Sequence, residues 1–173
     1  EGTSEIQQSI ISTFRWKTSR KTKGGYYEGI AGEMMGYEKD RESLGGQLVA
    51  LSAKALNAVI NLAHENRLTR QQFAMFCLAD MMASVEVSAA LTRKAKTLLD
   101  SSGPESEKIK AMARIFASET AQTVAQNAMK IVMGSGIFDD KAVSDFMESI
   151  SHSHLVRYYP GLIKDMDLVA DIL

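Results

Sequence analysis

The sequence contains few of the residues that interrupt or cross-link a fold. Its 173 residues include only two prolines, Pro104 and Pro160, and one cysteine, Cys77. Because proline ends helices, long helices are permitted almost throughout, and an all-β architecture is nearly excluded. A single cysteine cannot form an internal disulfide. Cys77 stands among apolar residues, so we expect it to be a buried core residue in a reducing compartment.

Neither sign of charge is in excess, and long apolar runs are missing. Twenty Lys and Arg against 21 Asp and Glu leave a formal net charge of −1, which argues against a dedicated nucleic-acid binder. No run of about 18 apolar residues could cross a bilayer, and no signal segment opens the chain. With 45% apolar residues, the composition predicts a soluble globular domain.

The first forty residues predict one short helix and one irregular segment. Ile6, Ile10 and Phe14 stand at i, i+4 and i+8, which predicts an amphipathic helix over 4–20. Glycines then cluster between Gly24 and Gly46. Because glycine loses much backbone entropy in regular structure, we expect a linker or irregular loop over 23–39, pinned by its tyrosines and methionines.

Apolar residues at three- and four-residue spacing predict long helices after this linker. We expect them over 41–66, 69–100 and 104–133, with a fourth beginning at Asp139 or Asp140 and a last turn after Pro160. The sequence therefore predicts an all-α fold, an antiparallel up-and-down four-helix bundle preceded by a short helix and a Gly-rich linker. Its expected divisions are 1–22, 23–40 and 41–173.

Motifs for chemistry are scarce in this bundle. There is no zinc-ligand spacing, no Gly-rich phosphate loop and no nucleophile elbow. Glu148 and His152 stand at i, i+4, but two groups do not complete a site, so we predict no metal. These absences keep open a non-enzymatic helical interaction module.

The first seven residues, in contrast to the bundle, carry a motif that indicates an enzyme. Glu1-Gly2-Thr3-Ser4-Glu5-Ile6-Gln7 resembles the E-G-T-x-x-I-Q segment near the end of the catalytic core in acyl-CoA dehydrogenases. The chain also opens without a methionine, which favours a piece cut from a longer protein, although proteolytic processing would give the same beginning. We therefore expect 1–22 to be the end of a dehydrogenase core and 41–173 to be a C-terminal helical bundle, and we expect the chain alone to be inactive.

The resemblance implies a role for each residue at this end. In the family, the glutamate removes the α-proton of the acyl thioester while a hydride passes from the β-carbon to FAD. Glu1 is then the catalytic base, Gly2 lies against the substrate, and Thr3, Ser4 and Glu5 approach the FAD. A carboxylate suits this chemistry because a water-poor pocket raises its basicity.

A second resemblance covers most of the remaining chain. Residues 72–95 are similar to a long helix in the extra C-terminal domain of the very-long-chain acyl-CoA dehydrogenase type. Residues 125–136 resemble the helix ending A-x-Q-I-x-G-G-x-G of the catalytic helical domain, from which Met133 and Ser135 depart. The bundle then resembles a degenerate second copy of that domain.

This family implies an FAD-dependent oxidoreductase of fatty-acid β-oxidation, acting on acyl-CoA and passing electrons to an electron-transfer flavoprotein. It also implies a homodimer or other homo-oligomer whose added bundle serves assembly or contacts a membrane surface. The expected location is the cytoplasm, or the mitochondrial matrix in a eukaryote, with a peripheral place at the inner membrane as one option. The alternative remains the interaction module.

Overall fold

The computed structural model describes residues 3–37 and 44–171, in which the regular elements are helices and no strand occurs. The expected all-α class is therefore confirmed. The elements, in chain order, are α1 (Ser4–Lys21), α2 (Gly25–Tyr37), α3 (Gly46–Glu65), the short 3-10 helix η1 (Leu68–Arg70), α4 (Gln72–Lys96), α5 (Pro104–Val132), α6 (Asp140–Ser149), α7 (His152–Leu155) and α8 (Leu162–Asp171).

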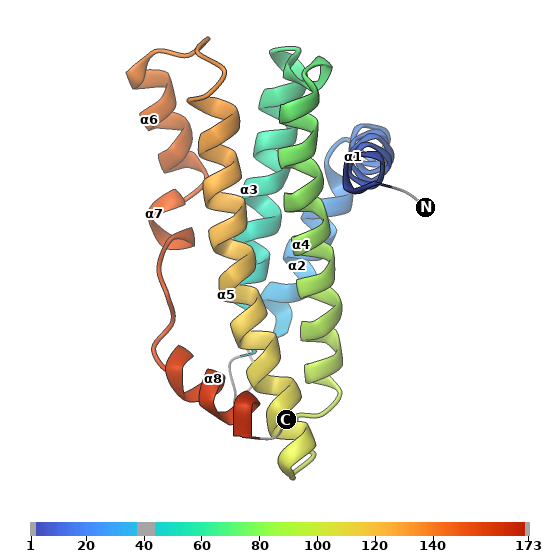
Figure 1. Ribbon diagram of the computed structural model, residues 1–173, viewed down its shortest axis with the longest axis vertical. Helices are drawn as coiled ribbons and strands as arrows, with labels where there is room; N and C mark the ends of the chain where they lie inside the picture. The colour runs from blue at the N-terminus through green and yellow to red at the C-terminus, as the bar shows by residue number, and fades with distance from the viewer. Residues whose placement is uncertain (1–2, 38–43, 172–173) are drawn as a thin grey trace.

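Helices α2, α3, α4 and α5 follow one another in alternating directions (Figure 1). Helix α2 packs against α3, and α4 packs against α5. The first helix, α1, is seen end-on in Figure 1, so it crosses α4 rather than running along it. Helices α6 and α7 lie beside the upper half of α5, and α8 lies against its lower half.

The expectation of a linker or irregular loop over 23–39 is wrong, because Gly25–Tyr37 forms helix α2. Its glycines at positions 25, 29, 32 and 36 all fall on the exposed face. The opposite face buries Tyr27, Ile30, Ala31 and Met34. Each glycine disfavours the helix by roughly 1 kcal/mol, but the apolar packing of the inner face outweighs that penalty.

Other boundaries follow local backbone signals. Helix α5 matches the range expected for it, and α6 begins after Asp139, whose Oδ1 accepts a hydrogen bond from the Ala142 amide at 2.7 Å. The helix expected to begin at Thr69 instead begins at Gln72, because Leu68–Arg70 forms the 3-10 turn η1. Helix α3 begins only at Gly46, after Gly45 in the left-handed region at φ +80°.

Gly45 also sets how closely two long helices approach. A Cβ atom built on it would lie 2.6 Å from Cβ of Ala117 on α5. Glycine is therefore needed twice at this position, for its positive φ and for the contact between the beginning of α3 and the middle of α5.

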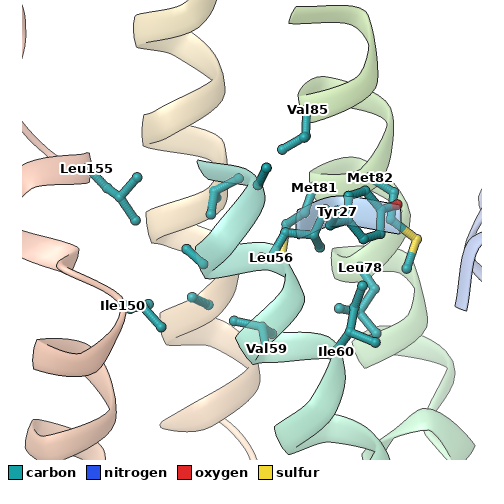
Figure 2. Close-up of a cluster of buried hydrophobic side chains, with 14 of the residues drawn as sticks. Tyr27, Leu56, Val59, Ile60, Leu78, Met81, Met82, Val85, Ile150 and Leu155 are labelled. Carbon is teal, nitrogen blue, oxygen red and sulfur yellow. The ribbon is translucent and has the colours of Figure 1, made fainter. Parts of the chain in front are cut away.

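The core lies between α2, α3 and α4 and continues toward α5 (Figure 2). Its largest fully buried side chains include Tyr27 of α2, Leu56 of α3 and Met81 of α4. Ile150 and Leu155, from the α6–α7 segment, extend this core on the side facing α3 and α5. Cys77 is buried as expected, and burial raises the pKa of its thiol.

Helix α4 is the one helix of the described ranges whose length and apolar content would allow it to cross a membrane. Half of its most apolar 18-residue window is buried inside the bundle, where it packs against α5, α1 and α3. Its apolar content is therefore that of a core helix at the centre of the bundle. A search for uninterrupted apolar runs misses it, because Asp80 and Glu86 interrupt its apolar sequence.

Candidate functional site: the motif end and the outer face of α1

The structure places the described part of the heptad at the beginning of α1. Glu1 and Gly2, the expected base and substrate contact, lie outside the described residues. Thr3 has an extended backbone (φ −64°, ψ 158°), and its carbonyl accepts the Gln7 amide at 3.1 Å. Ser4 and Glu5 form the first turn, and the side chains of Thr3, Ser4 and Glu5 are all exposed. The three expected cofactor contacts are therefore adjacent at one helix end.

Helix α1 contacts the bundle largely through polar side chains. The Gln8 amide donates to Oδ1 of Asp80 at 2.8 Å, and Arg15 pairs with Glu86 at 2.6 Å. Glu86 also accepts the hydroxyl of Tyr27 at 3.2 Å, so one carboxylate of α4 joins α1 and α2. The apolar contribution to this contact comes from Ile11 and Trp16 at the edge of the core.

The opposite face of α1 carries the expected apolar stripe, and it faces outward. Ile6, Ile10 and Phe14 are 52%, 63% and 61% exposed. A groove of about 530 Å³ follows this stripe, formed by α1 residues from Glu5 to Lys17 together with Gln72. A smaller groove of about 280 Å³ lies on the other side of Ile10 and Phe14, against α4. Ile10 and Phe14 thus form a ridge between two grooves.

The described residues at this end do not by themselves fit FAD. Thr3, Ser4 and Glu5 stand on an open surface, and the larger groove is formed almost entirely by one helix. A cofactor of that size is held by convergent polar groups from several elements. In the described ranges, none of the buried polar atoms that lack a hydrogen-bond partner lines this groove. The described residues of this helix end therefore do not form a flavin site by themselves.

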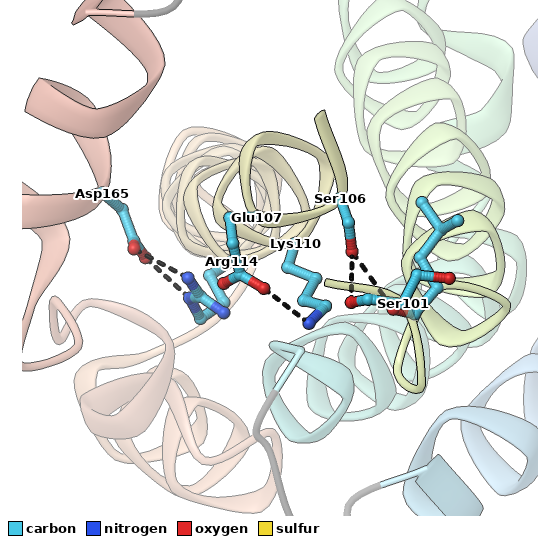
Figure 3. Close-up of polar contacts among 7 residues, drawn as sticks. Ser101, Ser106, Glu107, Lys110, Arg114 and Asp165 are labelled. Atoms are coloured by element: carbon cyan, nitrogen blue, oxygen red, sulfur yellow. Dashed lines mark hydrogen bonds and ion pairs between the residues drawn. The ribbon is translucent and has the colours of Figure 1, made fainter. Parts of the chain in front are cut away.

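A second concave region lies between the beginning of α3, the middle of α5 and α8, with a volume of about 410 Å³. At its wall, Arg114 donates two hydrogen bonds to Asp165, at 2.7 and 2.8 Å (Figure 3). The Tyr159 hydroxyl donates to the same carboxylate at 2.7 Å. Burial raises the pKa of Asp165, but the bonds from Arg114 and Tyr159 outweigh it and leave that pKa below its ordinary value.

Neither this cluster nor its neighbours were expected from the sequence. Arg114 and Asp165 stand 51 residues apart, and no short-range pattern links them. One turn before Arg114, the buried Lys110 pairs with Glu107 at 2.8 Å, and Ser106 Oγ donates to the Ser101 carbonyl at 2.9 Å (Figure 3). These contacts join the α4–α5 turn and α8 to the first half of α5, which is a structural role.

We expect Asp165→Asn to lower the free energy of unfolding by about 2 kcal/mol at pH 7, because it removes the charge beside a largely buried guanidinium. The folded pKa of Asp165 is depressed, so its contribution is present above the ordinary carboxyl pKa of about 4. It is lost as pH falls through the folded value. Urea unfolding at pH 7 and pH 3 should show the difference from the unsubstituted chain shrinking in acid.

The matched control for this substitution is Asp145→Asn. Asp145 pairs with Lys141 at 2.6 Å, but both side chains are mostly exposed, and such pairs contribute little. Equal effects of the two substitutions at pH 7 would show that the Asp165 pair does not hold α8 in place.

Within residues 3–37 and 44–171, no three His, Cys, Asp or Glu side chains gather in a way that could hold a metal ion. The Glu148 and His152 pair lies where α6 ends and α7 begins. His152 Nε2 is buried there without a hydrogen-bond partner.

Comparison with known proteins identifies the bundle. The family model for the acyl-CoA dehydrogenase C-terminal domain matches residues 28–155. Cyclohex-1-ene-1-carbonyl-CoA dehydrogenase of Syntrophus aciditrophicus is 31% identical over 143 residues, covering 78% of this chain and 33% of that protein. Human mitochondrial short-chain specific acyl-CoA dehydrogenase is 29% identical over 148 residues, covering 73% of this chain and 35% of its own length. No solved structure matches the chain significantly.

The chain thus spans about a third of the length of these curated relatives. The matched region begins inside α2 and ends with α7, so it includes most of the glycine-containing helix α2 and all of α3, α4 and α5. Because this match covers well over half of the chain, the chain belongs to the acyl-CoA dehydrogenase C-terminal domain family.

Proposed function

We propose that this chain is the C-terminal part of an FAD-dependent acyl-CoA dehydrogenase of the very-long-chain type. The observation that carries the proposal is an order along the chain. A heptad resembling the end of the family's catalytic core runs into the beginning of α1, and a match to the family's C-terminal domain follows over residues 28–155. The family's C-terminal domain therefore begins after the motif that normally stands near the end of the catalytic core. This is the order expected if the bundle is a degenerate second copy of that domain.

In this proposal Glu1 is the base that takes the α-proton of the acyl-CoA thioester, and Gly2 leaves room for the acyl chain. Thr3, Ser4 and Glu5 lie on an exposed first turn, which is available to an FAD held by the remainder of the enzyme. That flavin would supply the hydride acceptor. The residues of this chain hold one end of the site, and α1 fixes that end to the bundle through the Gln8–Asp80 and Arg15–Glu86 contacts.

The bundle itself is proposed to serve assembly rather than chemistry. Its buried ion pairs, such as Arg114–Asp165, hold helices together. A homo-oligomer, contact with a membrane surface and electron transfer to an electron-transfer flavoprotein belong to the same proposal, as does a location in the cytoplasm or mitochondrial matrix. The rival is an interaction module with no enzymatic parent.

The test compares the 173-residue chain with the same chain extended upstream as its gene encodes. Mixed with FAD and passed through a desalting column, the short chain should retain no flavin absorbance, because a site made by several elements is missing. The extended protein should retain FAD and be bleached by a long-chain acyl-CoA. Stoichiometric FAD on the short chain would contradict the proposal, and an upstream region without flavin binding would favour the interaction module.

A further inference from the structure

The part of α1 nearest the heptad is joined to the bundle by a polar contact. Residues 3–7 are all exposed, and Gln8 is the first residue of α1 whose side chain is partly covered. Its amide donates to Oδ1 of Asp80 on α4 at 2.8 Å. The packed section of α1 begins about a turn later, with Ile11 at the edge of the core and the buried Ser12. The heptad therefore lies beyond the Gln8–Asp80 bond, on a stretch of helix that nothing else in the described ranges covers.

A second polar contact with α4 gives α1 its direction. Arg15 stands seven residues after Gln8, which is about two turns, so both side chains lie on one face of α1. Arg15 pairs with Glu86 at 2.6 Å, and α1 crosses α4 in Figure 1. The apolar packing of Ile11 and Trp16 holds α1 on the bundle but is non-directional. A hydrogen bond depends on angle as well as distance, so the two polar contacts set the angle of the crossing.

We propose that Asp80 of α4 is a positioning residue for the base Glu1 and acts through Gln8. This inference rests on the proposed function. It gives the bundle a part in catalysis beyond assembly, without placing any residue of the bundle at the substrate. Glu1 stands seven residues before Gln8, so a small change in the angle of α1 at Gln8 becomes a larger displacement of the base. A misplacement of about 1 Å at a reacting group can cost about 10²-fold in rate.

The same helix supplies a matched control bond at its other end. Arg20 donates to Oδ1 of Asn61 on α3 at 3.0 Å. Like the Gln8–Asp80 bond, this contact is exposed and joins α1 to the bundle through side chains. Exposed bonds of this kind contribute little to stability, because water replaces the lost partner. The two bonds thus differ chiefly in their distance from the heptad.

The first test removes each bond in the upstream-extended protein. Asp80→Ala should slow flavin bleaching at saturating acyl-CoA by about tenfold, because the base is no longer held at the substrate. The acyl-CoA concentration for half-maximal rate and the FAD content should each stay within about twofold. Asn61→Ala should leave all three quantities unchanged. Tm should shift by no more than about 2 °C in either variant.

The second test exchanges donor and acceptor without changing the size of either side chain. Gln8→Glu sets two carboxylates against each other and should also slow bleaching by about tenfold. Asp80→Asn keeps an oxygen that accepts from Gln8, so it should bleach near the unsubstituted rate. Combining Gln8→Glu with Asp80→Asn restores the bond in the opposite direction. The rate should then recover to within about threefold, although the new carboxylate on α1 is still present.

Hydrogen exchange in the 173-residue chain supplies a readout that needs no flavin. The amides of residues 7–10 should exchange at least about threefold faster in Gln8→Glu than in the unsubstituted chain, and the double variant should reverse this change. Asn61→Ala should leave these amides unaffected. Exchange that does not respond to Gln8→Glu would show that the bond does not hold this part of α1, and would overturn the proposal.

The kinetic outcomes separate this proposal from the proposed function. If the extended protein binds FAD and is bleached, but Asp80→Ala bleaches as fast as Asn61→Ala, the remainder of the enzyme holds Glu1 and the positioning role of Asp80 is wrong. A double variant that stays as slow as Gln8→Glu leads to the same conclusion. In both cases the proposed function stands. An extended protein that binds no FAD overturns the proposed function, and the positioning role with it.

Discussion

In the upstream-extended protein, Glu1→Gln should reduce acyl-CoA-dependent bleaching of the flavin by about 10²- to 10⁴-fold, the usual contribution of a general base. The glutamine amide has nearly the shape of the carboxylate but cannot accept the substrate α-proton. Substrate binding and FAD content should therefore stay close to those of the unsubstituted protein. Stopped-flow absorbance after mixing with acyl-CoA measures the bleaching rate, and the flavin spectrum before mixing measures cofactor content.

Glu105→Gln is the matched control for this prediction. Glu105 has the same side chain and is exposed in the first turn of α5, away from the heptad. Its substitution should leave the bleaching rate unchanged. A Glu1→Gln protein that bleaches at the rate of the unsubstituted protein would remove Glu1 as the base. Equal losses from both substitutions would indicate a general effect of removing one carboxylate rather than the loss of the base.

The sequence predicts those helices best that carry both a beginning signal and an end signal. Pro104 sets the beginning of α5, and Asp139 caps α6. Helix α2 has neither kind of signal, and its four glycines gave it the composition of a linker. Glycine spacing does carry the missing information, since positions 25, 29, 32 and 36 repeat at helical intervals on one face. The burial of Tyr27 and Met34 depends on α3 and α4, which local propensity does not contain.

The candidate site likewise has parts that the sequence predicts and parts that it does not. The heptad is contiguous, so resemblance can identify it, although Glu1 and Gly2 lie outside the described residues. The direction of the Ile6–Ile10–Phe14 stripe was not predictable, because periodicity shows that one face is apolar but not whether this chain covers it. The Arg114–Asp165 pair depends on the packing of α8 against α5, and two charges 51 residues apart carry no local signal.

Tyr27→Ala should lower the free energy of unfolding by about 4 kcal/mol, and thus Tm by about 10 °C. Tyr27 is fully buried among residues of α3 and α4 (Figure 2), so the substitution removes a ring and leaves a cavity. It also removes the hydroxyl that donates to Glu86, the residue to which Arg15 of α1 is paired. Urea unfolding followed by circular dichroism measures the loss.

The neighbouring Tyr26→Ala distinguishes a core helix from a tether. Tyr26 is only half-buried, and its ring packs edge-on against Tyr27 at 5.0 Å between centroids. Its substitution should cost about 1 kcal/mol. A third variant, Tyr27→Phe, isolates the hydroxyl and should cost about 1 kcal/mol. Burial and the Glu86 carboxylate raise the pKa of Tyr27, so the hydroxyl remains a donor at neutral pH.

These three values together decide what α2 is for. If α2 were a tether pinned by its tyrosines, Tyr26→Ala and Tyr27→Ala would have similar small effects. A large loss confined to Tyr27→Ala means that the unfolding of the whole bundle includes α2. The end of α1 that carries the heptad is then held by the same cooperative unit, because Glu86 binds both Arg15 and Tyr27. Tyr27→Ala should accordingly also speed hydrogen exchange in α1, and by more than Tyr26→Ala, whose ring lies 5.3 Å from the guanidinium carbon of Arg15.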